Sequence, residues 1–198
     1  MVVMAAPVRD ATLRPGREPS APWSVDDLAA LPDDGLRYEL IDGALIVSPS
    51  PKPRHQLVSH RLAMLLDAAC AAEQRVFAAP LDWQPGADRS FQPDLLVVPV
   101  APLDGPLPAP VVVVEILSPS TKSVDRVLKM HAYAAAGVPQ YWIVDPGLDG
   151  AEPSIEVYDL IDGTTGAAYR LQGQAAGDEA LHVAGPVPTT VIPASLLR

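Results

Sequence analysis

The strongest constraint on this fold is the run VVVVEIL at residues 111–117, which a Ser/Pro/Thr segment follows at once. Four consecutive β-branched residues are typical of a strand buried on both faces, because apolar side chains on both sides of the pleat leave neither side for water. Glu115 is the exception within the run. A buried carboxylate is costly unless a cation, a proton or several donors compensate it, so Glu115 is either a satisfied structural acid or one end of a functional site.

A second acid stands at the start of another apolar run. Asp94 precedes the sequence LLVV at residues 95–98, so we expect it at the beginning of a second buried strand. Two acids carried by two apolar strands suggest a bound metal. The alternative is that each acid pairs with a Lys or Arg, but we favour the metal site because burying such acids without a cation is expensive.

Length and charge limit the domain organisation and the partners. A chain of 198 residues with 48% hydrophobic residues is long enough for one domain with its own core. We expect a flexible N-terminal tail over residues 1–21 and a single domain over residues 22–198. The formal net charge of −10 argues against a general polyanion-binding surface, because such surfaces rely on Lys and Arg. Any contact with nucleic acid must therefore be local or bridged by a metal.

The cysteine count and the hydropathy indicate the expected location of the protein in the cell. The single cysteine, Cys70, excludes an intramolecular disulfide and fits a reducing compartment. It lies in an apolar row at residues 62–72, which favours a small core residue over a nucleophile. No apolar run reaches the roughly 18 residues of a membrane span, and the first residues lack the features of a signal peptide. We therefore expect a cytoplasmic protein with no membrane partner.

The rest of the chain alternates between short strands and helices. Prolines at residues 49–53 hold an extended connector, and a Pro-rich loop covers residues 99–110. The periodicity and the turn residues predict, in order, a helix at 24–31, two strands joined by an Asp-Gly turn within 37–47, a helix at 55–73, strands at 75–79 and near 82–83, the strands of Asp94 and Glu115, a helix at 124–136, a strand at 140–145, and an edge hairpin of 154–160 with 168–171.

Local signals mark the ends of two of these helices. Ser24 and Asp27 have the spacing of a capping box, which places the start of the first helix. Ser123 is the expected N-cap of the helix at 124–136, and Gly137 is the expected residue just past its end.

The order of charged residues suggests a chemistry. Asp94 and Glu115 lie 21 residues apart on strands that we expect to be neighbours, and the helix that carries Lys129 leaves the end of the second strand. Phosphodiester hydrolysis needs hard oxygen ligands for Mg²⁺, and a positive charge to orient the attacking water or to offset developing charge. Asp94, Glu115 and Lys129 supply those parts.

An ordered set of motifs covers about residues 23–160. Its members are YELIDG at 38–43, SPSP at 48–51 with His55, Pro93-Asp94, VEILSPST at 114–121, Asp125, Lys129, Tyr133, GVP at 137–139, and Tyr141-Trp142. This set closely resembles the Uma2 family of the PD-(D/E)xK nuclease superfamily. The resemblance implies an α/β (α+β) fold with a restriction-endonuclease-like core, in which helices flank a central mixed β-sheet. It also implies a Mg²⁺-dependent (or Mn²⁺-dependent) endonuclease that acts on nucleic acid, with DNA the expected substrate.

The resemblance also assigns roles to residues of this sequence. Asp94 and Glu115 match the metal-binding acids, with the main-chain carbonyl of Ile116 as a further ligand. The superfamily pattern places Lys two residues after the Glu, where this chain has Leu117. Lys129, projecting from the next helix, would then be a catalytic lysine that has migrated. Glu39 matches a recurrent acid of the family and would hold a second cation or a water.

Several of these residues have a structural alternative. Lys129 lies four residues after Asp125, so the two side chains can form an ion pair on a solvated helix face, and Lys122 is a weaker rival for the catalytic role. For Glu39 we favour the alternative, in which it pairs with Arg37 or caps the turn.

Two aromatic residues, one on each of the two longer predicted helices, also admit two interpretations. His55 is more often a helix-start residue than a base, although its place beside the Pro connector leaves a site role open. Tyr133 is expected in the core or at the rim of the site rather than as a platform for base stacking.

Two classes of function stay open. The acid-acid-lysine order favours a metal-dependent phosphodiesterase, whereas the net charge of −10 and Leu117 favour a catalytically weak or inactive protein-interaction module on the same fold. Apolar edge strands would suit a homodimer, which a one-site chain would need to cleave both strands of DNA.

Overall fold

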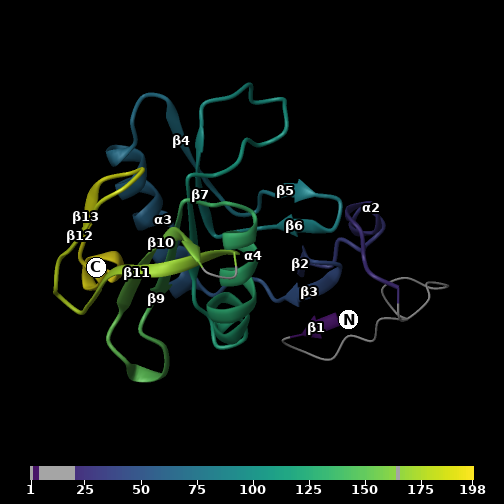
Figure 1. Ribbon diagram of the computed structural model, residues 1–198. Helices are drawn as coiled ribbons and strands as arrows, with labels where there is room; N and C mark the ends of the chain where they lie inside the picture. The colour runs from purple at the N-terminus through teal and green to yellow at the C-terminus, as the bar shows by residue number, and fades with distance from the viewer. Residues whose placement is uncertain (1, 5–20, 164–165) are drawn as a thin grey trace. The chain divides into compact units, whose positions relative to one another are not determined.

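The computed structural model describes residues 2–4, 21–163 and 166–198 (Figure 1). It is a mixed α+β fold with a central mixed sheet and few helices, so the predicted fold class is confirmed. The chain divides into two compact units, Met1–Ser50 with Asp82–Gln92, and Pro51–Leu81 with Pro93–Arg198. Most of the expected tail, residues 5–20, lies outside the described residues.

The first unit contains a five-stranded sheet and one short helix. Its sheet has the order β1-β3-β2-β6-β5, and β1 pairs parallel with β3 at a position where the sequence predicted no strand. The buried residues Trp23, Leu40, Leu45 and Val47 form its core. The elements are β1 (Val2–Met4), α2 (Val25–Leu28), β2 (Arg37–Ile41), β3 (Ala44–Ser48), β5 (Trp83–Gly86) and β6 (Arg89–Phe91).

Local sequence explains the start of α2 and the turn between β2 and β3. The main-chain N–H of Ser24 donates to the Asp27 carboxylate at 3.0 Å, which is the predicted capping box, although α2 ends at Leu28 rather than at residue 31. Asp42 and Gly43 have φ of 49° and 75°, the pair of positive values that a type I′ turn requires, so the predicted hairpin of β2 and β3 is confirmed.

The second unit contains a six-stranded sheet with the order β11-β10-β9-β8-β7-β4. The strands β8 and β9 run parallel and the other neighbours run antiparallel, so the sheet is mixed. A separate two-stranded sheet pairs β12 with β13. The strands are β4 (Gln74–Ala78), β7 (Leu95–Pro99), β8 (Val112–Ile116), β9 (Gln140–Asp145), β10 (Ser154–Gly163), β11 (Gly166–Ala176), β12 (Leu181–Val183) and β13 (Thr189–Val191).

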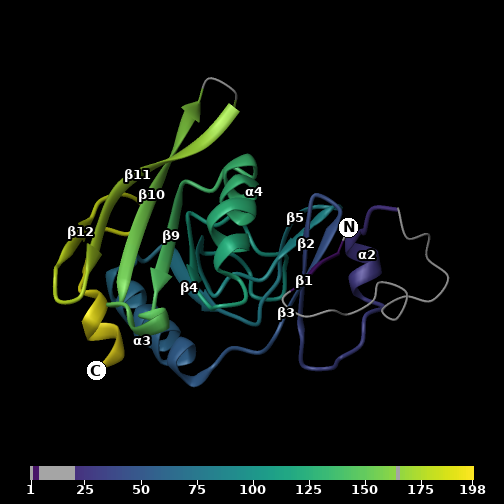
Figure 2. The same cartoon turned by 90° about the horizontal axis from the view of Figure 1, so that it is seen from below.

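Helices lie on both sides of this sheet (Figure 2). The helix α3 (Pro53–Ala69) packs its buried Val58, Leu62 and Leu66 against alternate residues of β8, among them Val114. Side chains alternate along a strand, so Glu115 faces the other side, where the π-helical turn η1 (Val124–Lys129) and α4 (Met130–Ala135) lie. Two short 3₁₀ turns, η2 (Leu148–Gly150) and η3 (Pro193–Leu197), complete the unit.

The structure corrects several element boundaries. The helix predicted for 55–73 runs over Pro53–Ala69, because Pro53 suits the first helical turn and so belongs to the helix rather than to the connector. Ser123 was predicted as an N-cap, which is wrong, because its φ of −76° and ψ of −34° are already helical and its side chain makes no capping hydrogen bond. The hairpin strand β10 continues to Gly163 instead of ending at residue 160.

The end of α4 agrees with the sequence. Gly137 has a φ of 77°, its N–H donates to the Ala134 carbonyl at 3.0 Å, and the Val138 N–H donates to the Tyr133 carbonyl at 3.1 Å. These two bonds form a Schellman motif, which satisfies carbonyls that the helix end would leave without a partner. Among the helices of the described residues, none is long and apolar enough to cross a membrane.

Candidate functional site

Asp94 is held by two donors from different elements of the second unit. It directly precedes β7, whose Leu95 pairs with Val114 of β8, so the antiparallel register places Asp94 beside the Glu115–Ile116 end of β8. Its Oδ2 atom accepts the main-chain N–H of Ile116 at 2.8 Å and lies 3.0 Å from Nε2 of His55 in α3. Asp94 is only 3% exposed, so these bonds offset part of the cost of burying its charge.

Glu115 receives two donors from the helical segment that follows β8. Its Oε1 atom accepts a hydrogen bond from Lys129 Nζ at 2.9 Å and from the Tyr133 hydroxyl at 2.6 Å. Glu115 and Lys129 are each 2% exposed, so this ion pair is buried rather than solvated. Lys129 thus contacts the Glu115 carboxylate, and its catalytic role stays a prediction.

Asp125 adds a third carboxylate to this cluster. Its Oδ1 atom lies 3.6 Å from Lys129 Nζ, so the alternative of an i,i+4 pair is present too, but both side chains are buried and no solvated face is involved. The Tyr141 hydroxyl donates to the Asp125 main-chain carbonyl at 3.0 Å. Burial first, and then the charges of Glu115 and Asp125, raise the pKa of Tyr141 well above its usual value. Tyr141 is therefore a buried neighbour of the carboxylates of this cluster.

The donor set fits a hard divalent cation. Three buried carboxylates (Asp94, Glu115 and Asp125) supply oxygen atoms of the kind that such a cation binds, and a cation would favour their ionised forms. Within the part of the chain that the structure describes, no three His, Cys, Asp or Glu side chains gather as metal ligands. Mg²⁺ does not require such a cage, because it is commonly held by one or two carboxylates and keeps several waters.

Glu39 belongs to the first unit and the other predicted site residues to the second. Glu39 is 1% exposed, and its Oε1 atom accepts the main-chain N–H of Gln92 at 2.9 Å. A neighbouring contact runs from the Arg37 guanidinium to the Gln92 carbonyl. Glu39 and Arg37 thus both hold the same peptide segment, and the role of Glu39 in a cation site stays a prediction.

Sequence reasoning missed two contacts of this site. The Tyr133 hydroxyl bonds directly to Glu115, although Tyr133 was expected in the core or at the rim. His55 contacts Asp94, across a sequence separation of 39 residues. The available signal was spacing for Tyr133, which follows Lys129 by four residues and so shares its helix face. No local signal linked His55 to Asp94.

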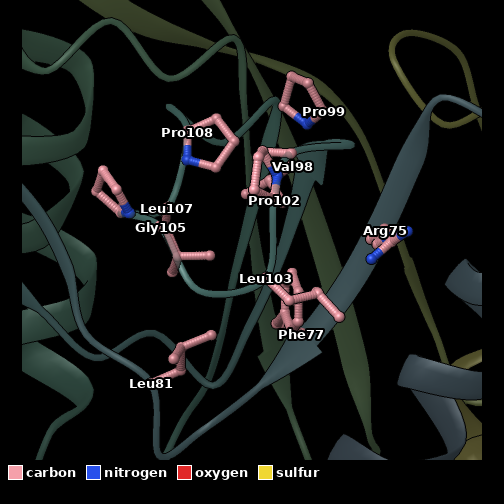
Figure 3. Close-up of a pocket in the computed structure, with 12 residues that line it drawn as sticks. Arg75, Phe77, Leu81, Val98, Pro99, Pro102, Leu103, Gly105, Leu107 and Pro108 are labelled. Carbon is pink, nitrogen blue, oxygen red and sulfur yellow. The ribbon is translucent and has the colours of Figure 1, made fainter.

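Other features of the second unit do not join the site. Cys70 is half-buried against the core, and burial raises the pKa of its thiol, which agrees with the predicted core role and disfavours a nucleophile. A hollow of about 110 Å³ lies between β4 and the Pro-rich loop, and none of the site residues lines it (Figure 3). Its lining includes Phe77, Leu81, Leu103 and Leu107, so it is mainly apolar.

Comparisons with known proteins bear on the fold and the family of this chain. One crystal structure, of a "putative nuclease belonging to DUF820" from Anabaena variabilis ATCC 29413, superposes with a TM-score of 0.64 and 21% sequence identity. The match covers 89% of this chain and 98% of that one, which supports the nuclease-like fold. No curated protein matches the chain.

The family comparison covers most of the sequence. A family model described as "Putative restriction endonuclease" matches residues 25–193, a range that includes Asp94, Glu115 and Lys129. The motif resemblance, the mixed sheet and this match agree with one another, and the chain belongs to the Uma2 family.

Proposed function

We propose that this chain is a Mg²⁺-dependent endonuclease that hydrolyses phosphodiester bonds in DNA, with Asp94 and Glu115 as the metal ligands and Lys129 as the catalytic lysine. One observation carries the proposal. The buried Asp94 accepts the main-chain N–H of Ile116, the residue that follows the buried Glu115 in β8, and a buried lysine from the next helical segment donates to Glu115. Membership of a family described as "Putative restriction endonuclease" supports the same reaction class.

The cation would be held by Asp94, Glu115 and the main-chain carbonyl of Ile116, which are hard oxygen donors suited to Mg²⁺ or Mn²⁺. When bound, it would polarise the phosphoryl group and stabilise the negative charge of the transition state. The residues of the chain hold the two acids in place. The Ile116 N–H donates to Asp94, while Lys129 and Tyr133 donate to Glu115, so both acids are held by hydrogen bonds before the reaction begins.

Lys129 would act on the attacking water and on the developing charge. At the position two residues after Glu115, where the superfamily has lysine, Leu117 is 1% exposed and brings no charge. Lys129 places its ammonium 2.9 Å from Glu115 instead. In a buried site a fixed charge is not screened by water, so it stabilises a transition state more strongly than an exposed lysine would.

A second candidate is a protein-interaction module on the same fold, with little or no catalysis. It is favoured by the buried Leu117 and by a net charge of −10, which disfavours unspecific attraction to DNA.

A homodimer and a cytoplasmic location also remain part of the proposal, the latter because a single cysteine suits a reducing compartment.

A plasmid-nicking assay tests the proposal. The wild type should nick supercoiled DNA in Mg²⁺ or Mn²⁺, and EDTA should abolish the reaction. Asp94→Asn and Glu115→Gln should lower the rate by about 100-fold or more, because both remove a charged ligand with little change in volume. Asp67→Asn is the matched control, since Asp67 is an exposed acid of α3 and outside the site. A wild type without metal-dependent nicking would favour the interaction module.

A further inference from the structure

His55 is the buried residue whose role remains to be explained. It lies in the first turn of α3, which begins at Pro53, and it is 8% exposed. Its Nε2 atom lies 3.0 Å from Asp94 Oδ2. Its Nδ1 atom is buried and has no hydrogen-bond partner within the described residues.

The proposed role of Asp94 as a metal ligand implies which nitrogen carries the proton. A metal-binding carboxylate is ionised and only accepts hydrogen bonds, so the His55 nitrogen at 3.0 Å from Asp94 would be the donor. Nδ1 needs no proton in that tautomer and remains an acceptor, and a buried acceptor without a partner is tolerated better than a buried N–H. Within the described residues, the buried imidazole therefore makes its polar contact through Nε2, with Asp94.

The contact also complements the second donor to Asp94. The Ile116 N–H reaches the same Oδ2 atom at 2.8 Å from β8, while His55 approaches from α3. Donors on two separate elements restrict the rotation of the carboxylate more than either donor alone. Because α3 is anchored by the buried Val58, Leu62 and Leu66, the imidazole is itself held in place.

We propose that His55 is a positioning residue, which orients the Asp94 carboxylate for the divalent cation. This inference rests on the proposed function, because it presupposes that Asp94 is a metal ligand. Removing a partner that orients a metal ligand typically weakens metal affinity by about 10–100-fold. His55 would thus affect the cation site without touching the cation.

Isothermal titration with Mn²⁺ tests this role on four folded proteins. His55→Leu keeps an apolar volume but removes the donor. His55→Gln offers an amide N–H at a reach similar to Nε2, so it should restore the bond. His60→Leu is the matched control, because His60 is an exposed histidine of the same helix.

The expected result is a Kd for Mn²⁺ that rises about 10–100-fold in His55→Leu, stays within a few-fold of wild type in His55→Gln, and is unchanged in His60→Leu. If His55→Leu does not fold, His55→Asn replaces it, because its shorter amide should not reach Asp94. Equal affinity in the donor-free variant and the wild type would overturn the inference and leave the proposed function intact.

Two further outcomes also decide the matter. Equal weakening in His55→Leu and His55→Gln would show that α3 needs the imidazole for packing rather than for its donor, and would overturn the positioning role. A wild type that binds no Mn²⁺, together with absent nicking activity, would overturn the proposed function and the inference with it.

Discussion

At the scale of single residues, hydrogen bonds from neighbouring side chains stabilise the buried carboxylates of the site. Glu115 is buried because Lys129 and Tyr133 both donate to its Oε1 atom. Breaking a buried pair by removing one partner is strongly destabilising, since it leaves an uncompensated charge. The same residues should therefore influence both stability and catalysis, and a test must separate the two effects.

Lys129→Ala should lower the nicking rate by about 100-fold or more, because one preorganised donor is typically worth about 10²–10³ in rate. It should also lower the free energy of unfolding by about 3–5 kcal/mol, since Glu115 would lose its buried partner. Nicking kinetics and urea denaturation measure the two effects. Lys122→Ala is the control, because Lys122 is exposed at the start of the same helical segment and was the rival for the role.

The outcome that contradicts this assignment is a Lys129→Ala protein that is folded and nicks DNA at the wild-type rate. A fall in rate with Lys122→Ala alone would move the catalytic role to Lys122.

The sequence could predict which side chains carry charge into the core, but not all of their partners. Asp94, Glu115 and Lys129 stood out because charges are rare in apolar runs or because they followed a recognisable motif order. His55 could not be linked to Asp94 in this way, because their contact joins a helix to the start of a strand 39 residues away. The main-chain N–H of Ile116 was missed for a similar reason, since the register of β7 and β8 decides where it points.

At the scale of elements, boundaries were predictable where local chemistry decides them. The Asp42-Gly43 turn and the end of α4 at Gly137 follow from backbone conformations that these residues favour. The start of the helical segment after β8 was wrong at Ser123, because the segment opens with a tight turn around Ser118 and Thr121, and Ser123 is already inside it. The strands β12 and β13 are three residues each, too short to show a period.

Gly137 gives a test of the element that carries Lys129. Gly137→Ala should lower the free energy of unfolding by about 1–2 kcal/mol, because the φ of 77° is strained for a residue with a Cβ atom. The cost should come from conformation alone, since an added Cβ would meet no atom within 4 Å. Gly105→Ala is the control, because Gly105 lies in the Pro-rich loop outside the positive-φ region and should change stability by less than about 1 kcal/mol. Equal effects in urea denaturation would contradict the Schellman account.

The tyrosines between α4 and the sheet give a test of charge. The Tyr141 ring packs at a tilt against the rings of Tyr133 and Tyr169, with centroid distances of 5.2 and 5.7 Å, and its raised pKa reflects burial and the nearby acids. An unfolded chain releases the phenolic proton near pH 10, while the folded chain keeps it. The stability that this proton provides is therefore complete below about pH 10 and is lost as pH rises toward the folded pKa.

Tyr141→Phe removes this contribution. Above about pH 10, the free energy of unfolding should fall less steeply with pH than in wild type, by up to about 1.4 kcal/mol per pH unit. Denaturation by urea between pH 9 and 11 measures the two slopes. Parallel slopes would mean that Tyr141 ionises normally in the folded protein, which would contradict a pKa raised by its burial beside these acids.

At the scale of the whole molecule, the fold class was predictable and the division into units was not. Alternating short strands and helices imply a mixed sheet with helices on its faces, which is what the second unit contains. The two units interleave in sequence, because Pro51–Leu81 is inserted between the two segments of the first unit. No change of composition marks such a division, so we still propose that residues 22–198 form one domain.

The negative net charge of the chain makes the proposed cation site important for binding DNA. A chain with a net charge of −10 gains little from unspecific attraction to DNA, so in the proposed reaction a bound cation would provide the local positive charge at the phosphodiester. The central claim is therefore that Asp94 and Glu115 together hold one divalent ion.

Equilibrium titration with Mn²⁺, with the bound ion counted per chain, tests this claim most directly. The account predicts one ion per chain in the wild type and in Asp67→Asn, and loss of that ion in both Asp94→Asn and Glu115→Gln. An ion that remains bound in either site variant with wild-type affinity, or a wild type that binds none, would contradict it.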